Sequence, residues 1–290
     1  MTTPTVTPEM APSILAAEPV SMWSKAKILW TFRGLIYSLT LKEIKARYKH
    51  SVLGFLWSLL NPLGMMLVFT FVFGYLMRNG EIEKFPLFLL CGLLPWNYFT
   101  SSVMSGIHSV VGNGNLVKKV YFPREVLPIA YVLSNLVNFL LAFLLLFIAL
   151  VVFNAKFSPW LWLLPVVVLM QTCFVVGLSL ILSTLQVFYR DTGMVMDVAL
   201  LAWFFVTPVF YSIDFIPRFK LLFGMEWDVH RWLYILNPMA SLIRTYRDLL
   251  YWGYRTDLDF FLRTAMTCIV VLLFGYWFFN RFSGRFGEEV

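Results

Sequence analysis

The amino-acid sequence predicts an all-α integral membrane protein with six transmembrane helices. Of its 290 residues, 60% are hydrophobic and only 13% are charged, whereas a soluble domain carries about 25% charged residues. A helix needs about 20 apolar residues to cross the hydrocarbon core of a bilayer, because each residue advances about 1.5 Å. Several uncharged segments reach that length. The composition therefore predicts that most of the chain lies in lipid rather than in water.

The N-terminal part of the chain is predicted to stay outside the bilayer. Residues 1–22 contain four prolines and no Lys or Arg, which indicates a flexible cytoplasmic tail and not a signal peptide. Residues 23–55 mix apolar and basic residues, and Phe32, Leu35 and Leu39 share one helical face. We expect an amphipathic helix from Trp23 to His50 in the headgroup region, with an ordinary juxtamembrane anchor as the alternative.

The transmembrane domain is predicted to occupy residues 56–290. Its six expected spans are Leu56–Met77, Pro86–Val111, Leu127–Phe153, Trp160–Val187, Met194–Tyr211 and Thr264–Phe279. Asn61-Pro62, near the start of the first span, can sit in the first turn or produce a kink.

The distribution of cations predicts that both termini are cytoplasmic. Seven Lys and Arg residues precede the first span, and the second connection contains Lys118, Lys119 and Arg124. The first and third connections contain only three basic residues. Cytoplasmic connections carry the excess of cations. The last outer connection opposes this assignment with seven basic residues, although long loops count less.

That outer connection, residues 212–263, is not simply hydrophilic. An apolar run precedes the break at Asn237-Pro238, and after it Leu242, Tyr246 and Leu249 share a helical face. The opposite face carries Arg244, Arg247 and Asp248. We expect two short re-entrant helices on the outer side. The alternative is a surface amphipathic hairpin without a functional role.

Few residues in the predicted spans could drive transport. The sequence contains no phosphate-binding loop of the form G-x-x-x-x-G-K-[ST]. His108 and Asp197 are placed near inner helix ends, and not at the midplane where ion-coupled transporters keep ionisable groups. The three cysteines, Cys91, Cys173 and Cys268, lack metal-ligand spacing and are predicted to be small core residues. Energy must therefore come from another protein.

The second cytoplasmic connection is the predicted docking element for that protein. Gly112-Asn113-Gly114 ends the second span, Leu116–Phe122 can form a short amphipathic helix, and Pro123 stops it. A generic basic loop would have a similar composition.

Five motifs carry a resemblance to a known family. They are Arg47–Trp57 followed by Asn61-Pro62, Asn115–Pro128, Val187–Asp191, Thr207–Tyr211 and Leu236–Met239. Together they resemble the permease subunits of polysaccharide-exporting type-2 ABC transporters, a family that includes O-antigen, capsule and teichoic-acid exporters. The likeness covers nearly all of the chain except the N-terminal tail.

The resemblance implies a homodimer in the bacterial cytoplasmic membrane. Each copy binds a separate ATP-binding subunit, which holds ATP and Mg, and the complex moves a polysaccharide attached to an isoprenoid lipid. The chain itself then needs no cofactor, metal or catalytic residue, and its net charge of +7 faces membrane lipids rather than nucleic acid. Residues 115–125 correspond to the coupling helix and 212–263 to outer gate helices.

The resemblance also assigns individual residues. The ATPase-coupling residues are Leu116, Lys118, Lys119, Tyr121, Phe122, Arg124 and Glu125. The interfacial or elbow residues are Arg47, Tyr48, Gly54 and Trp57.

A conduit for sugars is expected to contain aromatic rings, and the chain has 29 Phe, 13 Tyr and 11 Trp. Sugars stack on aromatic faces. Phe69 and Phe73 in the first span, with Phe210 and Tyr211 at the outer end of the fifth, are the conduit candidates. Aromatic rings also fill lipid-facing surfaces and interfacial belts, so that alternative stays open.

Two other functions are compatible with parts of the sequence. Asp257-Leu258-Asp259 forms the D-x-D pair that holds a metal and a sugar diphosphate in glycosyltransferases, which would make the chain a membrane-embedded sugar transferase. Thr256 and Asp257 are instead expected to cap the last helix. A drug or small-lipid exporter of the same architecture is the other alternative.

Overall fold

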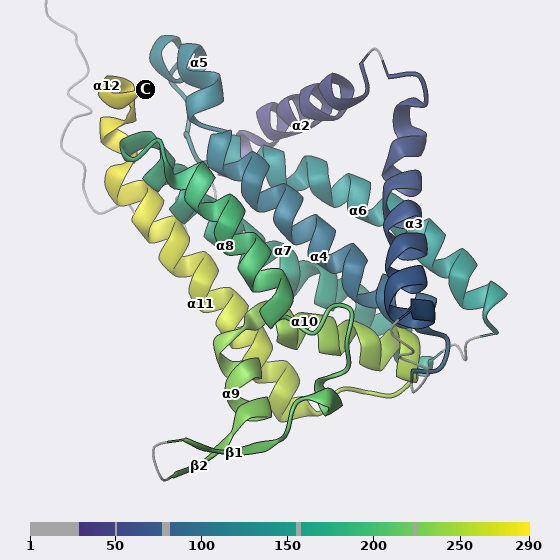
Figure 1. The fold of residues 1–290 in the computed structure, drawn as a ribbon. Coiled ribbons are helices and arrows are strands. Elements are labelled where there is room, and N and C mark those ends of the chain that lie inside the picture. Colours follow the sequence, from purple (N-terminus) through teal and green to yellow (C-terminus); the bar gives the residue numbers. More distant parts are fainter. Residues whose placement is uncertain (1–28, 50, 77–81, 155–157, 223–224) are drawn as a thin grey trace, which may run out of the picture.

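The computed structural model describes residues 29–49, 51–76, 82–154, 158–222 and 225–290. The predicted tail, 1–22, and the first part of the predicted interfacial helix lie outside these residues. Figure 1 shows a bundle of long helices with short helices at both ends. Helices α2, α5 and α12 lie at one end, and helix α9 with a two-stranded hairpin lies at the other.

Five helical segments of the described chain are long and apolar enough to cross a membrane. They are Gly54–Leu76, Phe85–His108, Val126–Val152, Pro159–Phe188 and Leu258–Glu289. Each overlaps a predicted span, which leaves only the fifth predicted span, Met194–Tyr211, without such a helix.

These segments are built from the following elements. The first segment consists of η1 (Gly54–Leu56), α3 (Trp57–Phe69) and the π-helical η2 (Thr70–Leu76). The second and third segments are α4 (Phe85–His108) and α6 (Val126–Val152), and the fourth consists of η4 (Pro159–Leu163) and α7 (Leu164–Phe188). The last consists of α11 (Leu258–Phe282), η7 (Ser283–Arg285) and α12 (Phe286–Glu289).

The fifth predicted span is shorter than expected. Helix α8 runs over Thr192–Val206, 15 residues, or about 22 Å at 1.5 Å per residue, against about 30 Å of hydrocarbon. The prediction extended the helix to Tyr211 and is wrong at that end. Thr207 turns to an extended conformation with ψ 130°, because the residue before a proline, here Pro208, is pushed out of the helical region.

Helix α4 forms the centre of the bundle and packs against α6, α7 and α3. Most of its side chains are buried, including Leu90, Phe99 and Val103. Helices α7 and α11 touch backbone to backbone: a Cβ on Gly177 would lie 2.5 Å from the Val271 carbonyl oxygen. Small residues allow membrane helices to approach this closely.

The two short helices expected in the outer connection are present. Helix α9 is Val229–Leu236 and α10 is Pro238–Arg247, and the break falls at Asn237-Pro238 as expected. The Asn237 side chain accepts a hydrogen bond from the Ala240 amide and caps α10. The antiparallel hairpin of β1 (Phe219–Leu222) and β2 (Met225–Asp228) was not predicted.

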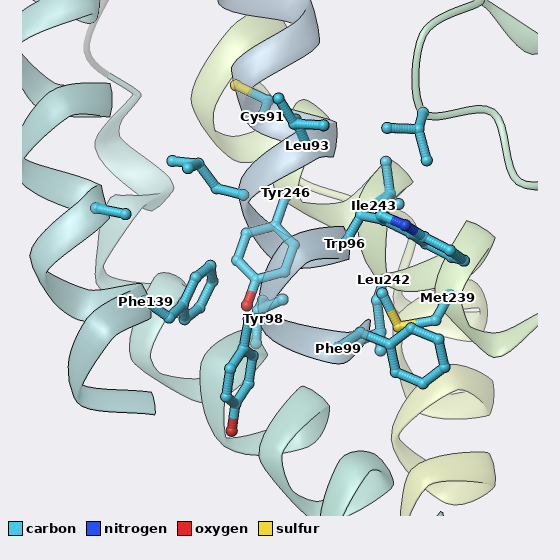
Figure 2. Close-up of a cluster of buried hydrophobic side chains, with 14 of the residues drawn as sticks. Cys91, Leu93, Trp96, Tyr98, Phe99, Phe139, Met239, Leu242, Ile243 and Tyr246 are labelled. Atoms are coloured by element: carbon cyan, nitrogen blue, oxygen red, sulfur yellow. The ribbon is translucent and has the colours of Figure 1, made fainter. Parts of the chain in front are cut away.

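Helix α10 is a core element, since it packs against α4, α7 and α11. Figure 2 shows its Tyr246 side chain among Tyr98, Phe139 and other buried residues. The Tyr246 hydroxyl donates to Gln171 Oε1 at 2.8 Å, and Gln171 Nε2 donates to the Pro95 carbonyl oxygen at 2.7 Å. The buried hydroxyl and amide are thereby satisfied.

At the other end, α2 (Arg33–Tyr48) packs along α6. Leu35, Ile36 and Leu39 lie against a buried cluster, while Lys42 and Lys45 are exposed. The connection between α4 and α6 consists of η3 (Val111–Asn113) and α5 (Gly114–Lys119). Helix α5 is shorter than the predicted Leu116–Phe122 helix, because Val120 is already extended.

Candidate coupling surface, aromatic cluster and outer cavity

The predicted coupling residues divide into an exposed group and a packed group. Lys118, Lys119 and Tyr121 are exposed, and the Tyr121 side chain is fully so. Aromatic residues are enriched at protein interfaces, so the Tyr121 ring is compatible with a docking role. We call Lys118, Lys119, Val120 and Tyr121 the coupling surface.

The other predicted coupling residues hold this surface in place. Phe122 is buried and Leu116 is partly buried in the same apolar cluster. Glu125 is 8% exposed, and its carboxylate accepts a hydrogen bond from the Tyr276 hydroxyl at 3.4 Å. Arg124 donates to the Ser283 carbonyl oxygen. The structure therefore turns Arg124 and Glu125 toward α11 and η7.

The C-terminal residues complete this end of the molecule, a role that the sequence prediction missed. Phe286 is fully buried and its ring packs against Phe279 and Phe188. Helix α12 contacts α5, and Val290 lies against Gly114. The signal available in the sequence was Phe286 itself, an aromatic residue in an otherwise polar terminal segment.

The predicted elbow residues lie where α2 turns into α3. The Arg47 guanidinium donates to Asn135 Oδ1 at 2.8 Å, and the Tyr48 hydroxyl donates to Asn138 Oδ1 at 2.7 Å. Gly54 has φ +50°, which other L-residues rarely adopt. These contacts tie the turn to α6.

A cavity of about 360 Å³ adjoins the elbow. Its lining includes four amide side chains, Asn61, Asn97, Asn135 and Asn138, together with Trp57. Trp57, the fourth predicted elbow residue, is half exposed.

The four conduit candidates come together in one aromatic cluster. Phe73 and Phe210 stack with ring centroids 4.6 Å apart, Phe69 and Phe73 stack at 5.7 Å, and Phe210 meets Tyr211 edge-on at 5.1 Å. Phe204 joins them from α8. The cluster connects the C-terminal half of the first predicted span to the C-terminal end of α8.

Arg247 is the largest departure from the sequence prediction for the outer helices. It was expected on a polar face opposite Tyr246, but it is buried, 6% exposed. Its Nη1 and Nη2 atoms donate to the carbonyl oxygens of Pro208 and Val209 at 2.6 and 2.5 Å. Its guanidinium carbon lies 3.5 Å from the centre of the Phe88 ring. Carbonyl oxygens of the non-helical segment that follows α8 supply the acceptors that this buried cation needs.

Asp248 is also buried, contrary to the prediction. The Thr256 hydroxyl donates to its Oδ2 atom at 2.9 Å. Burial raises the pKa of Asp248 to about 6, against the lowering effects of the Thr256 hydrogen bond and of Arg244. Thr256 was predicted to cap α11, but its hydroxyl serves Asp248 instead. Asp257 is the N-cap residue of α11, but its side chain makes no capping hydrogen bond.

A cavity of about 870 Å³, the outer cavity, opens beside these residues. It is lined from α9, α10, η6 (Asp248–Trp252), the start of α11 and the hairpin. Both aspartates of the D-x-D pair, Asp257 and Asp259, line it. Within the described chain no cluster of three or more His, Cys, Asp or Glu side chains could hold a metal.

The remaining polar candidates lie where the sequence placed them. His108 is the last residue of α4, and Asp197 is an exposed residue in the first half of α8. Cys91 and Cys268 are buried, and Cys173 is partly buried.

Comparison with known proteins gives a consistent result. The sequence model of the ABC-2 type transporter family matches residues 34–251. The chain is 33% identical to an O-antigen export system permease protein RfbA of Klebsiella pneumoniae, over 88% of this chain and 94% of that protein. It is 36% identical to RfbA of Myxococcus xanthus over 90% and 97%. The polysialic acid transport protein KpsM of Escherichia coli is 24% identical over 83% and 90%.

Proposed function

Because this chain belongs to the ABC-2 type transporter family, we propose that it is the membrane-spanning subunit of an ATP-driven exporter of lipid-linked polysaccharide. The observation that carries the proposal is the match with O-antigen export permeases along almost their entire length, 94% and 97%. The cargo is a polymer of O-antigen, capsule or teichoic-acid type on an isoprenoid lipid. It crosses the cytoplasmic membrane.

The proposed topology has six spans, with α8 as the fifth. Helix α8 alone is short, and the non-helical residues 207–211 carry the chain onward to the outer side. Backbone outside a helix is tolerated at membrane depth where protein covers it, and Arg247 supplies hydrogen bonds to two carbonyls of this segment. Both termini then lie in the cytoplasm.

Energy is proposed to enter through the coupling surface. Two copies of an ATP-binding subunit bind ATP and Mg, one against each copy of this chain. Lys118, Lys119 and Tyr121 offer the partner two cations and one ring. Phe122 is buried beneath the coupling surface, and the Arg124 guanidinium donates to the Ser283 carbonyl oxygen in η7. A displacement of α5 is therefore transmitted to the end of α11 through packed residues.

The proposed path for the polymer runs along the aromatic cluster of Phe69, Phe73, Phe210 and Tyr211, at the interface with a second copy of the chain. Several aromatic side chains next to this cluster remain exposed in the single chain, including Phe71 and Phe205. Stacked rings provide flat apolar faces for successive sugars and require no specific hydrogen bond. A conduit of this kind can pass polymers of different composition.

The test of this division of labour is an ATPase assay on three samples: the purified chain, the ATP-binding subunit, and the complex of both in lipid nanodiscs. We expect no turnover from the chain alone and polymer-stimulated turnover from the complex. Turnover by the chain without its partner would refute the proposal.

A further inference from the structure

The outer cavity has a composition that the coupling and conduit functions do not require. Its lining carries about twice as many charged as aromatic side chains. They are Arg218, Arg231, Arg244, Arg247, Arg263 and His230; Asp214, Asp228, Asp248, Asp257 and Asp259; and Phe88, Tyr234, Trp252, Tyr254 and Phe260. The five arginines and five aspartates cancel in formal charge.

Most of these charges are not paired with each other. Among the described residues, the cavity contains one ion pair, Arg218 with Asp228 at 3.5 Å. Arg247 is committed to backbone carbonyls. Asp257 and Asp259 are exposed and have no ion pair among the described side chains. The two aspartates of the D-x-D pair are therefore open to a ligand, whereas Asp228 and Asp248 already accept hydrogen bonds from the Arg231 amide and the Thr256 hydroxyl.

One side of the cavity is a platform formed by Phe260. The guanidinium carbons of Arg244 and Arg263 each lie 4.8 Å from the centre of this ring, and Tyr234 meets it edge-on at 5.2 Å. The Nη2 atom of Arg263 is buried and has no hydrogen-bond partner in the described part of the chain. A buried donor without a partner is destabilising, so the Arg263 side chain would gain from turning toward a ligand acceptor in the cavity that it lines.

The charge balance decides which ligand class fits. A phosphate or diphosphate would be attracted by Arg244 and Arg263, but it would be repelled by carboxylates in the same lining, such as Asp257. A neutral sugar has no such conflict. Its hydroxyls accept from guanidinium groups and donate to carboxylates, and its apolar face packs on an exposed ring such as Trp252.

We propose that the outer cavity is a carbohydrate-binding site that holds neutral sugar residues of the polymer as it leaves the conduit. Arg263 and Asp257 bind hydroxyls from opposite sides, and Phe260 orders the two arginines beside it. This inference rests on the proposed function and adds a specific contact with the cargo on the outer side.

The experiment uses the full chain with its ATP-binding partner in nanodiscs. The probe is a short oligosaccharide cut from the strain's own polysaccharide after mild acid release from lipid, labelled at one end for fluorescence polarisation. The test variants are Arg263→Gln and Asp257→Asn. The control is Arg255→Gln, since Arg255 is exposed, stacks on Trp160 and does not line the cavity.

We expect the wild type and Arg255→Gln to bind the probe equally, and both test variants to bind at least tenfold more weakly. Inorganic diphosphate at millimolar concentration should not compete. Equal binding by all four proteins, no binding by the wild type, or displacement by diphosphate would overturn the inference.

Restoration of surface polymer in a strain lacking the chain separates the two claims. If the wild type restores export and the binding results fail, only the cavity assignment is wrong. If the wild type does not restore export, the proposed function is wrong. Asp257→Asn keeps the backbone of α11 intact, because the Asp257 side chain makes no capping hydrogen bond, so it tests the site even if Arg263→Gln folds poorly.

Discussion

Val290 lies directly on Gly114: a Cβ on Gly114 would come within 2.6 Å of the Val290 Cγ1 atom. The last residue of the chain and the first residue of α5 are thus in contact. Phe286 anchors the same terminal segment in the apolar cluster beneath α5. The C-terminal helix therefore packs against α5, the helix that carries the lysines of the coupling surface.

Phe286→Ala is expected to loosen this packing. Removing a fully buried Phe side chain costs about 3–5 kcal/mol, and here the cost falls on the contact between α12 and α5. Polymer-stimulated ATPase activity of the complex should fall severalfold while membrane insertion is retained. Glu288→Ala, on the exposed side of α12, is the matched control. Unchanged stimulation in Phe286→Ala would exclude a supporting role for the terminus.

Charge reversal at Lys118 and Lys119 is expected to abolish co-purification of the ATP-binding subunit. Both side chains are exposed beside Tyr121, so the change alters the surface without disturbing the core. The control is Lys45→Glu, an equally exposed change on α2. The docking assignment would be contradicted by normal recovery of the partner with the double variant.

The charge-reversal variant leaves Arg124 unchanged. The family resemblance grouped it with Lys118 and Lys119, because all three lie in the predicted coupling segment, residues 115–125. Its guanidinium in fact donates to the Ser283 carbonyl, 159 residues further along the chain. Side-chain direction at the end of a short helix depends on such distant contacts, and a pattern of local charge cannot predict it.

Gly92→Ala is expected to destabilise the outer half of the bundle. The new methyl carbon would lie 2.8 Å from both Arg247 Nη2 and the Val209 carbonyl oxygen. Overpacking of a core position costs about 1–3 kcal/mol, and here it also displaces a buried cation from its acceptors. A lowered melting temperature in detergent is the readout. Gly64→Ala in α3, where no atom lies within 4 Å of the added carbon, should show no such loss.

The raised pKa of Asp248 predicts that the stability of the protein depends on pH. Its pKa is raised from 3.8 to about 6 by burial, so the protonated form stabilises the fold. That contribution is present below pH 4 and is lost as the pH rises through 6, a change of about 3 kcal/mol at roughly 1.4 kcal/mol per unit.

The comparison is with Asp248→Asn, which cannot titrate. Relative to this variant, the wild type should lose melting temperature between pH 4 and pH 6.5, the range between the two pKa values. Asp214→Asn, an exposed change in the same cavity, should follow the wild type. A parallel pH profile for the wild type and Asp248→Asn would show that Asp248 does not titrate in this range.

The helical spans were largely predictable because length and hydrophobicity fix them locally. Leu127–Phe153 was expected and Val126–Val152 is observed. The break at Asn237-Pro238 and the grouping of Phe69, Phe73, Phe210 and Tyr211 were also anticipated. The early end of α8 was not, although the dipeptide Thr207-Pro208 contained the signal.

The outer side could be predicted only in part. Amphipathic spacing placed Leu242 and Tyr246 in the core correctly, but it assigned Arg247 and Asp248 to the surface because they are charged. Their burial depends on acceptors and donors from other elements, namely the carbonyls of Pro208 and Val209 and the Thr256 hydroxyl. Periodicity along one helix contains no information about those partners.

The most direct test of the central claim is the location of the polymer in a strain from which this chain has been deleted. If the chain is the export subunit, full-length polymer still attached to its lipid should accumulate on the cytoplasmic side while surface polymer disappears, and the wild-type chain should reverse both effects. Loss of polymer synthesis would indicate a transferase instead, and unchanged surface polymer would contradict the account.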